Sequence, residues 1–146
     1  MINFFLLFFL LLNIFLFCFY IFSPKEDFKL TPYLFLLGMF VKVDIPLISI
    51  FWIVSSIFAL YLNNFLIFST LFFGFWSIRS LGEVVYWLLQ QFSLVKRNPP
   101  ERLCFSSYFK GEAVWVVYQV FWQVILIFVF LGFLICVALL YKSYFS

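Results

Sequence analysis

Residues 113–141 read AVWVVYQVFWQVILIFVFLGFLICVALLY, and this run contains no charged side chain. An α-helix rises about 1.5 Å per residue, so the run would be roughly 43 Å long as a helix. The hydrocarbon core of a bilayer is only about 30 Å thick. The run therefore predicts a transmembrane helix that tilts or that protrudes from the membrane.

The composition of the whole chain is that of a polytopic membrane protein. Of its 146 residues, 67% are apolar and 10% are charged, and the mean hydropathy is +1.18. A soluble domain of this size needs more polar surface to cover its core. Phenylalanine contributes 26 residues. We assign most of them to positions that face lipid rather than to an aromatic cage around a ligand.

Three further spans are predicted from runs without charge. Residues 2–22 form the first, which we interpret as a retained helix because a signal peptide would need a basic start and a small-residue cleavage site. Residues 45–78 are too long for one span, and Asn63-Asn64 divides them with a turn. The second helix is therefore expected at about 45–62, and the third at about 65–90.

A shorter apolar stretch, residues 32–41, precedes the second helix. Ten residues are too few to cross a bilayer, so this stretch is expected to be interfacial or re-entrant. The alternative is that the second span begins here, which would bury Lys42 and Asp44 in the membrane at a cost of several kcal/mol unless they are paired. The predicted fold is a single all-α membrane domain, a compact bundle of four transmembrane helices.

Basic residues are distributed unevenly between the two sides of this topology. The segments between the first and second helices and between the third and fourth contain Lys25, Lys29, Lys42, Lys96, Arg97, Arg102 and Lys110. The opposite side has only Lys142. By the positive-inside rule, both termini are expected outside the cytoplasm. The expected location is a bacterial cytoplasmic membrane, with an organelle inner membrane as the alternative.

Arg79 and Glu83 stand one helical turn apart inside the third predicted span. Ionisable groups at membrane depth are costly, so each needs a partner, a wet cavity or a function. A rotation of about 100° per residue places Tyr86 and Gln90 on the same face of the helix. The third span therefore has one polar face.

The fourth predicted span has a second polar face, which Glu112, Gln119 and Gln123 share. Arg79 lies about 21 Å along its helix from Phe65, and therefore about 9 Å inside the cytoplasmic boundary. Gln119 lies about 9 Å inside the same boundary, so we expect it to neighbour Arg79. The candidate polar seam comprises Arg79, Glu83, Tyr86, Gln90, Glu112, Gln119 and Gln123, with Lys42 and Asp44 as additional members.

Three interpretations of this seam are open. It is a structural network that fixes the register of the helices, with Arg79 also able to reach the inner headgroups. Alternatively, it is a polar cavity that opens to the cytoplasm and takes an ion, a proton or a lipid headgroup. In the third interpretation, the charges are completed by another membrane subunit.

The segment between the third and fourth spans, residues 93–112, is polar and basic. Asn98-Pro99-Pro100-Glu101 resembles an N-cap followed by a proline start, which predicts a short surface helix. The segment is too short to present a nucleic-acid site, so its charges are expected to contact anionic lipid. Aromatic residues near the same boundary are expected to form an interfacial belt.

The sequence gives no positive sign of catalysis. It has no histidine, which excludes His-based metal sites and Ser-His-Asp triads, and its three cysteines follow no metal-binding spacing. No Gly-rich phosphate loop is present. We expect no catalytic, cofactor or metal site. The only pairs available to an intramembrane enzyme are Asp44 with Glu83, or Ser80 with Lys42.

The expected function is therefore non-enzymatic. The chain would act through helix–helix association, as a homo-oligomer or as an accessory subunit of another membrane protein. One alternative is a small oligomeric transporter or channel that uses Arg79, Glu83 and Gln119. A second is an immunity- or lysis-type membrane protein. The expected partners are the lipid bilayer and another membrane chain, without nucleic acid.

Overall fold

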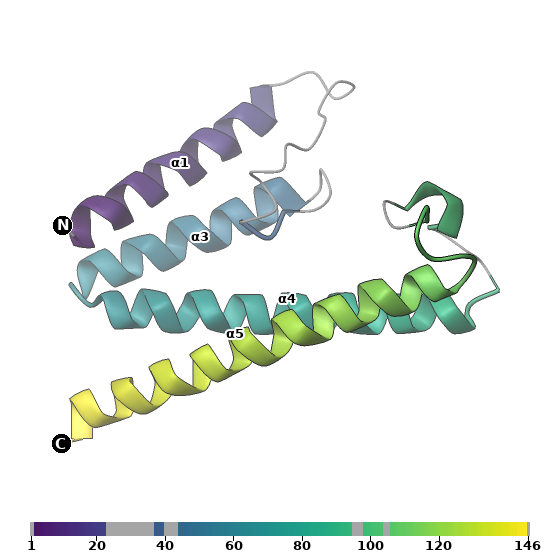
Figure 1. Ribbon diagram of the computed structural model, residues 1–146. Coiled ribbons are helices and arrows are strands. Elements are labelled where there is room, and N and C mark those ends of the chain that lie inside the picture. The colour runs from purple at the N-terminus through teal and green to yellow at the C-terminus, as the bar shows by residue number, and fades with distance from the viewer. Residues whose placement is uncertain (1, 23–36, 40–43, 95–97, 104–105, 146) are drawn as a thin grey trace. The chain divides into compact units, whose positions relative to one another are not determined.

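The computed structural model describes residues 2–22, 37–39, 44–94, 98–103 and 106–145. These residues form four long helices and one short 3₁₀ helix, and they contain no strand. The elements, labelled in Figure 1 where there is room, are α1 (Ile2–Phe22), α3 (Asp44–Tyr61), α4 (Phe65–Phe92), η1 (Pro100–Arg102) and α5 (Ala113–Phe145).

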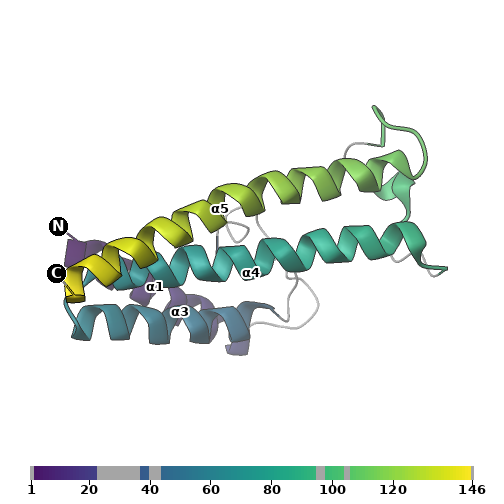
Figure 2. The ribbon, with the colours of Figure 1, turned by 90° about the horizontal axis from the view of Figure 1, so that it is seen from below.

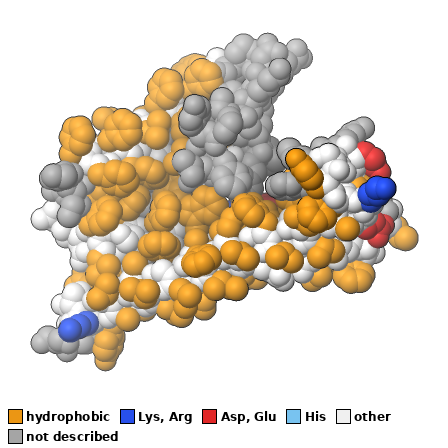
Figure 3. Space-filling view, viewed as in Figure 1, with side chains coloured by type: hydrophobic (Ala, Val, Ile, Leu, Met, Phe, Trp, Pro, Cys, Tyr) orange, Lys and Arg blue, Asp and Glu red, His pale blue; other side chains and the backbone are white. Residues whose placement is uncertain are grey.

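All four long helices are long and apolar enough to cross a membrane. This confirms the prediction of an all-helical chain with four candidate membrane spans. Hydrophobic side chains are spread over the described surface in the view of Figure 3. The last helix is longer than its charge-free run, because it continues through Lys142 to Phe145. Of the stretch 32–41, only Leu37–Met39 lies within the described residues.

The chain divides into two compact units, and α4 passes from one to the other. The first unit comprises Met1–Leu71 with Lys142–Ser146, and the second comprises Phe72–Tyr141. Each unit is described separately below. The single domain and the compact four-helix bundle expected from the sequence stay predictions.

In the first unit, α1 and α3 lie side by side and antiparallel (Figures 1 and 2). Their core is aromatic. The Phe9 ring meets Trp52 edge-on at 5.5 Å between centroids, and Phe68 from the start of α4 lies 5.3 Å from Phe9. Ser49 and Ala59 on the buried face of α3 are small, which lets neighbouring helices approach closely.

The predicted turn between α3 and α4 is present. Asn63 has a positive φ of 47°, a conformation that asparagine adopts more readily than most residues. The side-chain oxygen of Asn64 accepts a hydrogen bond of 2.9 Å from the backbone N–H of Leu66. Asn64 thus caps the first turn of α4.

In the second unit, α4 and α5 pack against each other along most of their length (Figure 2). At one level, the Phe73 ring covers Gly132 and the Phe133 ring covers Gly74. Further along α4, Trp87 stacks on Tyr118 with centroids 4.6 Å apart. Since these pairs run in opposite directions along the two helices, they fix an antiparallel register.

Candidate functional site

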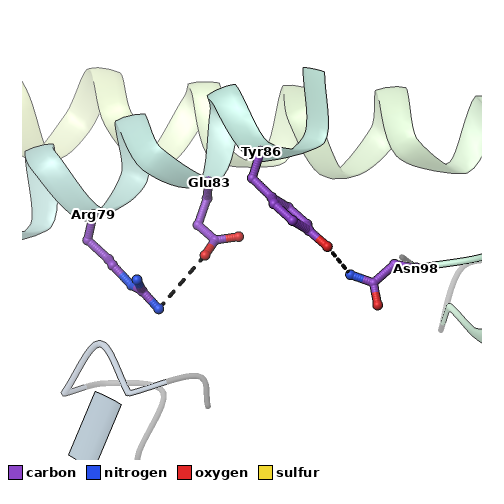
Figure 4. Close-up of polar contacts among 4 residues, drawn as sticks. All are labelled: Arg79, Glu83, Tyr86 and Asn98. Carbon is purple, nitrogen blue, oxygen red and sulfur yellow. Dashed lines mark hydrogen bonds and ion pairs between the residues drawn. The ribbon is translucent and has the colours of Figure 1, made fainter. Parts of the chain in front are cut away.

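Arg79 and Glu83 lie on one face of α4, near the middle of the helix (Figure 4). Arg79 Nη2 is 3.9 Å from Glu83 Oε1, and the two side chains are 28% and 19% exposed. The two residues are thus one helical turn apart, and their charged groups are partly shielded from solvent.

Tyr86 and Gln90 continue this face, and both contact Asn98 of the following segment. Asn98 Nδ2 donates a hydrogen bond of 2.5 Å to the Tyr86 hydroxyl oxygen, as Figure 4 shows. The backbone N–H of Asn98 donates to Gln90 Oε1 at 3.2 Å, and the Gln90 side chain is buried. A residue outside the helices thus supplies partners to two side chains of α4.

Trp115, in the first turn of α5, completes this network. Its indole N–H donates a hydrogen bond of 2.9 Å to the backbone carbonyl of Asn98, and the residue is fully buried. Asn98 is therefore bonded to the end of α4 and to the beginning of α5. We refer to Tyr86, Gln90, Asn98 and Trp115 as the Asn98 network.

A second polar contact joins the two helices directly. Gln91 Nε2 donates a hydrogen bond of 2.6 Å to Gln119 Oε1, and it also lies 3.3 Å from the carbonyl oxygen of Trp87. The contact is next to the stacked pair of Trp87 and Tyr118. The hydrogen bond between Gln91 and Gln119 and the stacking of Trp87 on Tyr118 thus join the end of α4 to the beginning of α5.

The expected proximity of Gln119 to Arg79 is wrong. Gln119 contacts Gln91, and counting six residues along α4 from Phe73 and six back along α5 from Gly132 places Arg79 level with about Leu126. The estimated depth of Gln119 was wrong because it assumed that the first residue of α5 lies at the membrane boundary. In the structure, the first two turns of α5 instead pack against the end of α4.

Of the remaining members of the predicted seam, all but Lys42 lie within the described residues. Glu112 is exposed just before α5, and Gln123 is half-buried within α5. Asp44 is the first residue of α3 and belongs to the first unit, whereas Lys42 is outside the described residues. The seam as one functional set stays a prediction.

Sequence reasoning missed Asn98, Gln91 and Trp115 as members of the site. The Asn98-Pro99-Pro100 pattern predicted that Asn98 caps a short helix, but the capping position of η1 is Pro99 and has no side-chain bond. The short helix itself is present as a single 3₁₀ turn. The one available signal was that Gln90 and Gln91, two adjacent amides, stand shortly before an asparagine.

The chemistry of the site is that of hydrogen bonding between neutral groups, next to one ion pair. Among the described residues, no group of three or more histidine, cysteine or carboxylate side chains could hold a metal ion. Comparison with protein-family models, curated proteins and solved structures gives no match for this chain. The function must therefore be argued from the geometry alone.

Proposed function

We propose that this chain is a non-enzymatic integral membrane protein that acts by binding another membrane protein chain. The observation that supports this proposal is an apolar surface at the end of α4. Twenty residues of α4, from Phe65 to about Val84, are enough to cross a hydrocarbon core of about 30 Å. Exposed apolar side chains continue beyond that point.

We call these side chains the terminal patch. Leu89, Phe92 and Leu94 are 58%, 77% and 100% exposed, and Leu88 is 39% exposed. Within α4, Leu88 and Phe92 are about 120–160° around the helix from Tyr86 and Gln90, and Leu89 lies between the two sides, about 60° from Tyr86. Large apolar side chains that lie beyond the hydrocarbon core and outside the protein core are typical of a protein-binding surface.

The Asn98 network supports the same proposal. Its polar atoms bond to one another, so it holds the ends of α4 and α5 together rather than lining a cavity. A rigid end can present the terminal patch to a partner without an ordering cost on binding. We propose further that this end faces the cytoplasm, because the segment 93–112 is rich in lysine and arginine.

Photo-crosslinking in native membranes tests this function. A photoreactive phenylalanine analogue at Phe92 is expected to give an adduct of discrete size with a protein, whose mass distinguishes a second copy from another subunit. The matched control is the same analogue at Phe128, which is 70% exposed and lies in the charge-free part of α5. Lipid adducts alone at both positions would overturn the proposal.

A transporter or channel is the second candidate, and the Arg79–Glu83 pair favours it. Two ionisable side chains that are only 28% and 19% exposed, near the middle of a membrane helix, are typical of ion or proton pathways. Purified protein in liposomes would then move protons or monovalent cations, and Glu83→Gln would reduce the flux. Equal flux in protein-free liposomes, wild type and variant would remove this candidate.

A further inference from the structure

Leu37, Gly38 and Met39 form a buried turn in the first unit. The carbonyl oxygen of Leu37 accepts a hydrogen bond of 3.0 Å from the indole N–H of Trp52. Leu37 is 8% exposed and Met39 is 1% exposed. Gly38 has a φ of 80°, in the region that glycine adopts without strain. The turn is therefore non-helical backbone enclosed by protein.

The position of Trp52 gives the depth of this turn along α3. Trp52 is eight residues from Asp44, the first residue of α3, which corresponds to about 12 Å. If α3 crosses the bilayer, the turn lies near a residue that is well inside the hydrocarbon region. Non-helical backbone occurs at such depth only where protein surrounds it or where water reaches it.

Three polar side chains of the same unit, those of Asn13, Ser49 and Ser56, are fully buried and incompletely bonded. Asn13 and Ser49 are both 0% exposed. Asn13 Nδ2 donates a hydrogen bond of 2.8 Å to the Phe9 carbonyl, whereas Asn13 Oδ1 has no partner among the described residues. Ser49 Oγ has none there either. Such atoms are rare in folded proteins and usually mark a bound water or another ligand.

The contact of Phe9 with Trp52 places these two side chains at the same level. Asn13 is one turn beyond Phe9 along α1, and Ser49 is one turn before Trp52 along the antiparallel α3. Asn13 is about 16 Å from the start of α1, and Ser49 is about 18 Å from the end of α3. Both therefore lie near the middle of a bilayer of ordinary thickness.

We propose that Asn13 Oδ1 and Ser49 Oγ hold a bound water molecule, close to the buried Leu37–Met39 turn. Asn13 Oδ1 can only accept a hydrogen bond, so a backbone carbonyl cannot satisfy it and a donor must be supplied. Water can donate to Asn13 and still exchange a hydrogen bond with the Ser49 hydroxyl. Buried waters typically make about three such bonds.

The neutral character of the site favours water over an ion. Asn13 and Ser49 carry no charge, and a desolvated cation needs several oxygens or a carboxylate to replace its hydration. Ser77 of α4 is also buried, but its hydroxyl donates a hydrogen bond of 2.7 Å to the Phe73 carbonyl oxygen. Ser77 therefore serves as a dry reference.

Water-edited solid-state NMR of the full chain in liposomes, with labelled asparagine and serine, tests this proposal. Water magnetisation is expected to reach Asn13 and Ser49 clearly faster than it reaches Ser77, while Asn64 in the α3–α4 turn gives the rate of a residue in contact with bulk water. Build-up at Asn13 as slow as at Ser77 would overturn the proposal and would indicate a direct bond between Asn13 and Ser49.

Two variants test the individual ligands. Asn13→Leu identifies the Asn13 signal and should also abolish the fast build-up at Ser49. Ser49→Ala leaves Asn13 in place and is the smaller change, so it remains informative if Asn13→Leu does not fold. Build-up at Asn13 should become slower in Ser49→Ala. Unchanged build-up at Asn13 would show that Ser49 is not a ligand and would overturn the site as proposed.

Discussion

The Phe73 ring lies directly against Gly132, so that a Cβ atom added at position 132 would meet Phe73 Cε1 at 2.7 Å. The relation is reciprocal one residue further along each helix, where a Cβ at Gly74 would lie 3.2 Å from Phe133 Cε2. Each helix thus provides one aromatic ring and one glycine. The hydrophobic effect is weak between helices in lipid. These two contacts therefore stabilise the pairing of α4 and α5 through close van der Waals packing.

Gly132→Ala is therefore expected to lower the free energy of unfolding by about 1–3 kcal/mol, the usual range for overpacking. The ring of Phe73 must move to admit the methyl group. Gly82→Ala is the matched control, because a Cβ at Gly82 meets nothing within 4 Å. It should leave stability unchanged or raise it by up to about 1 kcal/mol through helix propensity. Unfolding in mixed micelles measures both variants, and equal effects would contradict the packing argument.

A double variant tests whether the Phe73 ring is the cause of the destabilisation by Gly132→Ala. Phe73→Leu in the Gly132→Ala background gives the added methyl group room, so the double variant should be less destabilised than the sum of the two single variants. Strict additivity would mean that Gly132 is needed for a reason other than the approach of Phe73.

The bond from Asn98 to Tyr86 predicts energetic coupling between a residue outside the helices and α4. Asn98→Ala and Tyr86→Phe are each expected to destabilise the chain, with an interaction energy of about 0.5–1.5 kcal/mol in a double-mutant cycle. Tyr108→Phe is the control, because Tyr108 is 80% exposed. A coupling energy near zero between Asn98 and Tyr86 would show that the bond does not hold the helix ends together.

Removal of the Trp52 donor is expected to destabilise the first unit. Trp52→Phe keeps a ring against Phe9 but leaves the buried Leu37 carbonyl without its donor, at a cost of about 1–3 kcal/mol. Trp87→Phe is the comparison, because the Trp87 indole N–H has no hydrogen-bond partner among the described residues. If unfolding measurements show the larger loss in Trp87→Phe, the bond to Leu37 contributes little.

The charge pair predicts a smaller coupling. Since Arg79 and Glu83 are one turn apart with 3.9 Å between their charged atoms, we expect an interaction energy of about 0.5 kcal/mol from the cycle Arg79→Ala and Glu83→Ala. A coupling well above this value would assign the pair a larger structural role. Comparison of the cycle with the liposome flux of the same variants separates stability from transport.

The proposed orientation can be tested in whole cells. After the native cysteines are replaced, Lys142→Cys should react with a membrane-impermeant maleimide added outside, because the charge distribution predicts that the C-terminus lies there. Lys110→Cys should react only after the cells are opened. The reverse pattern would invert the topology, and with it the side on which the terminal patch lies.

The helices were predictable from the sequence because charge-free runs of sufficient length have few alternatives in a membrane. Residues 63–64 separate α3 from α4 as expected, since asparagine tolerates the positive φ of that turn. Local pattern and length thus determine where each helix lies in the chain. They leave open how far one helix is shifted along its neighbour.

The shift of one helix along its neighbour could not be predicted from the sequence. The register of α4 against α5 depends on rings that fit glycines, such as Phe73 on Gly132, and no periodic pattern marks these pairs. The prediction that Asn98 caps a short helix was wrong for a related reason. Its neighbours Pro99 and Pro100 favour a local capping interpretation, whereas its actual partners, Tyr86 and Trp115, are 12 and 17 residues away in sequence. Tertiary bonds prevailed over a local preference.

Asn98 is hydrogen-bonded to Gln90 of α4 and to Trp115 of α5. The lobe, by which we mean the segment between Asn98 and Trp115, is therefore anchored at both ends. Its length is therefore decoupled from the packing of the helices. Tyr108, 80% exposed within this lobe, is a suitable insertion point for an epitope or a small fluorescent domain. Natural variation in the length of this lobe should likewise be tolerated, while the residues at its two ends are retained.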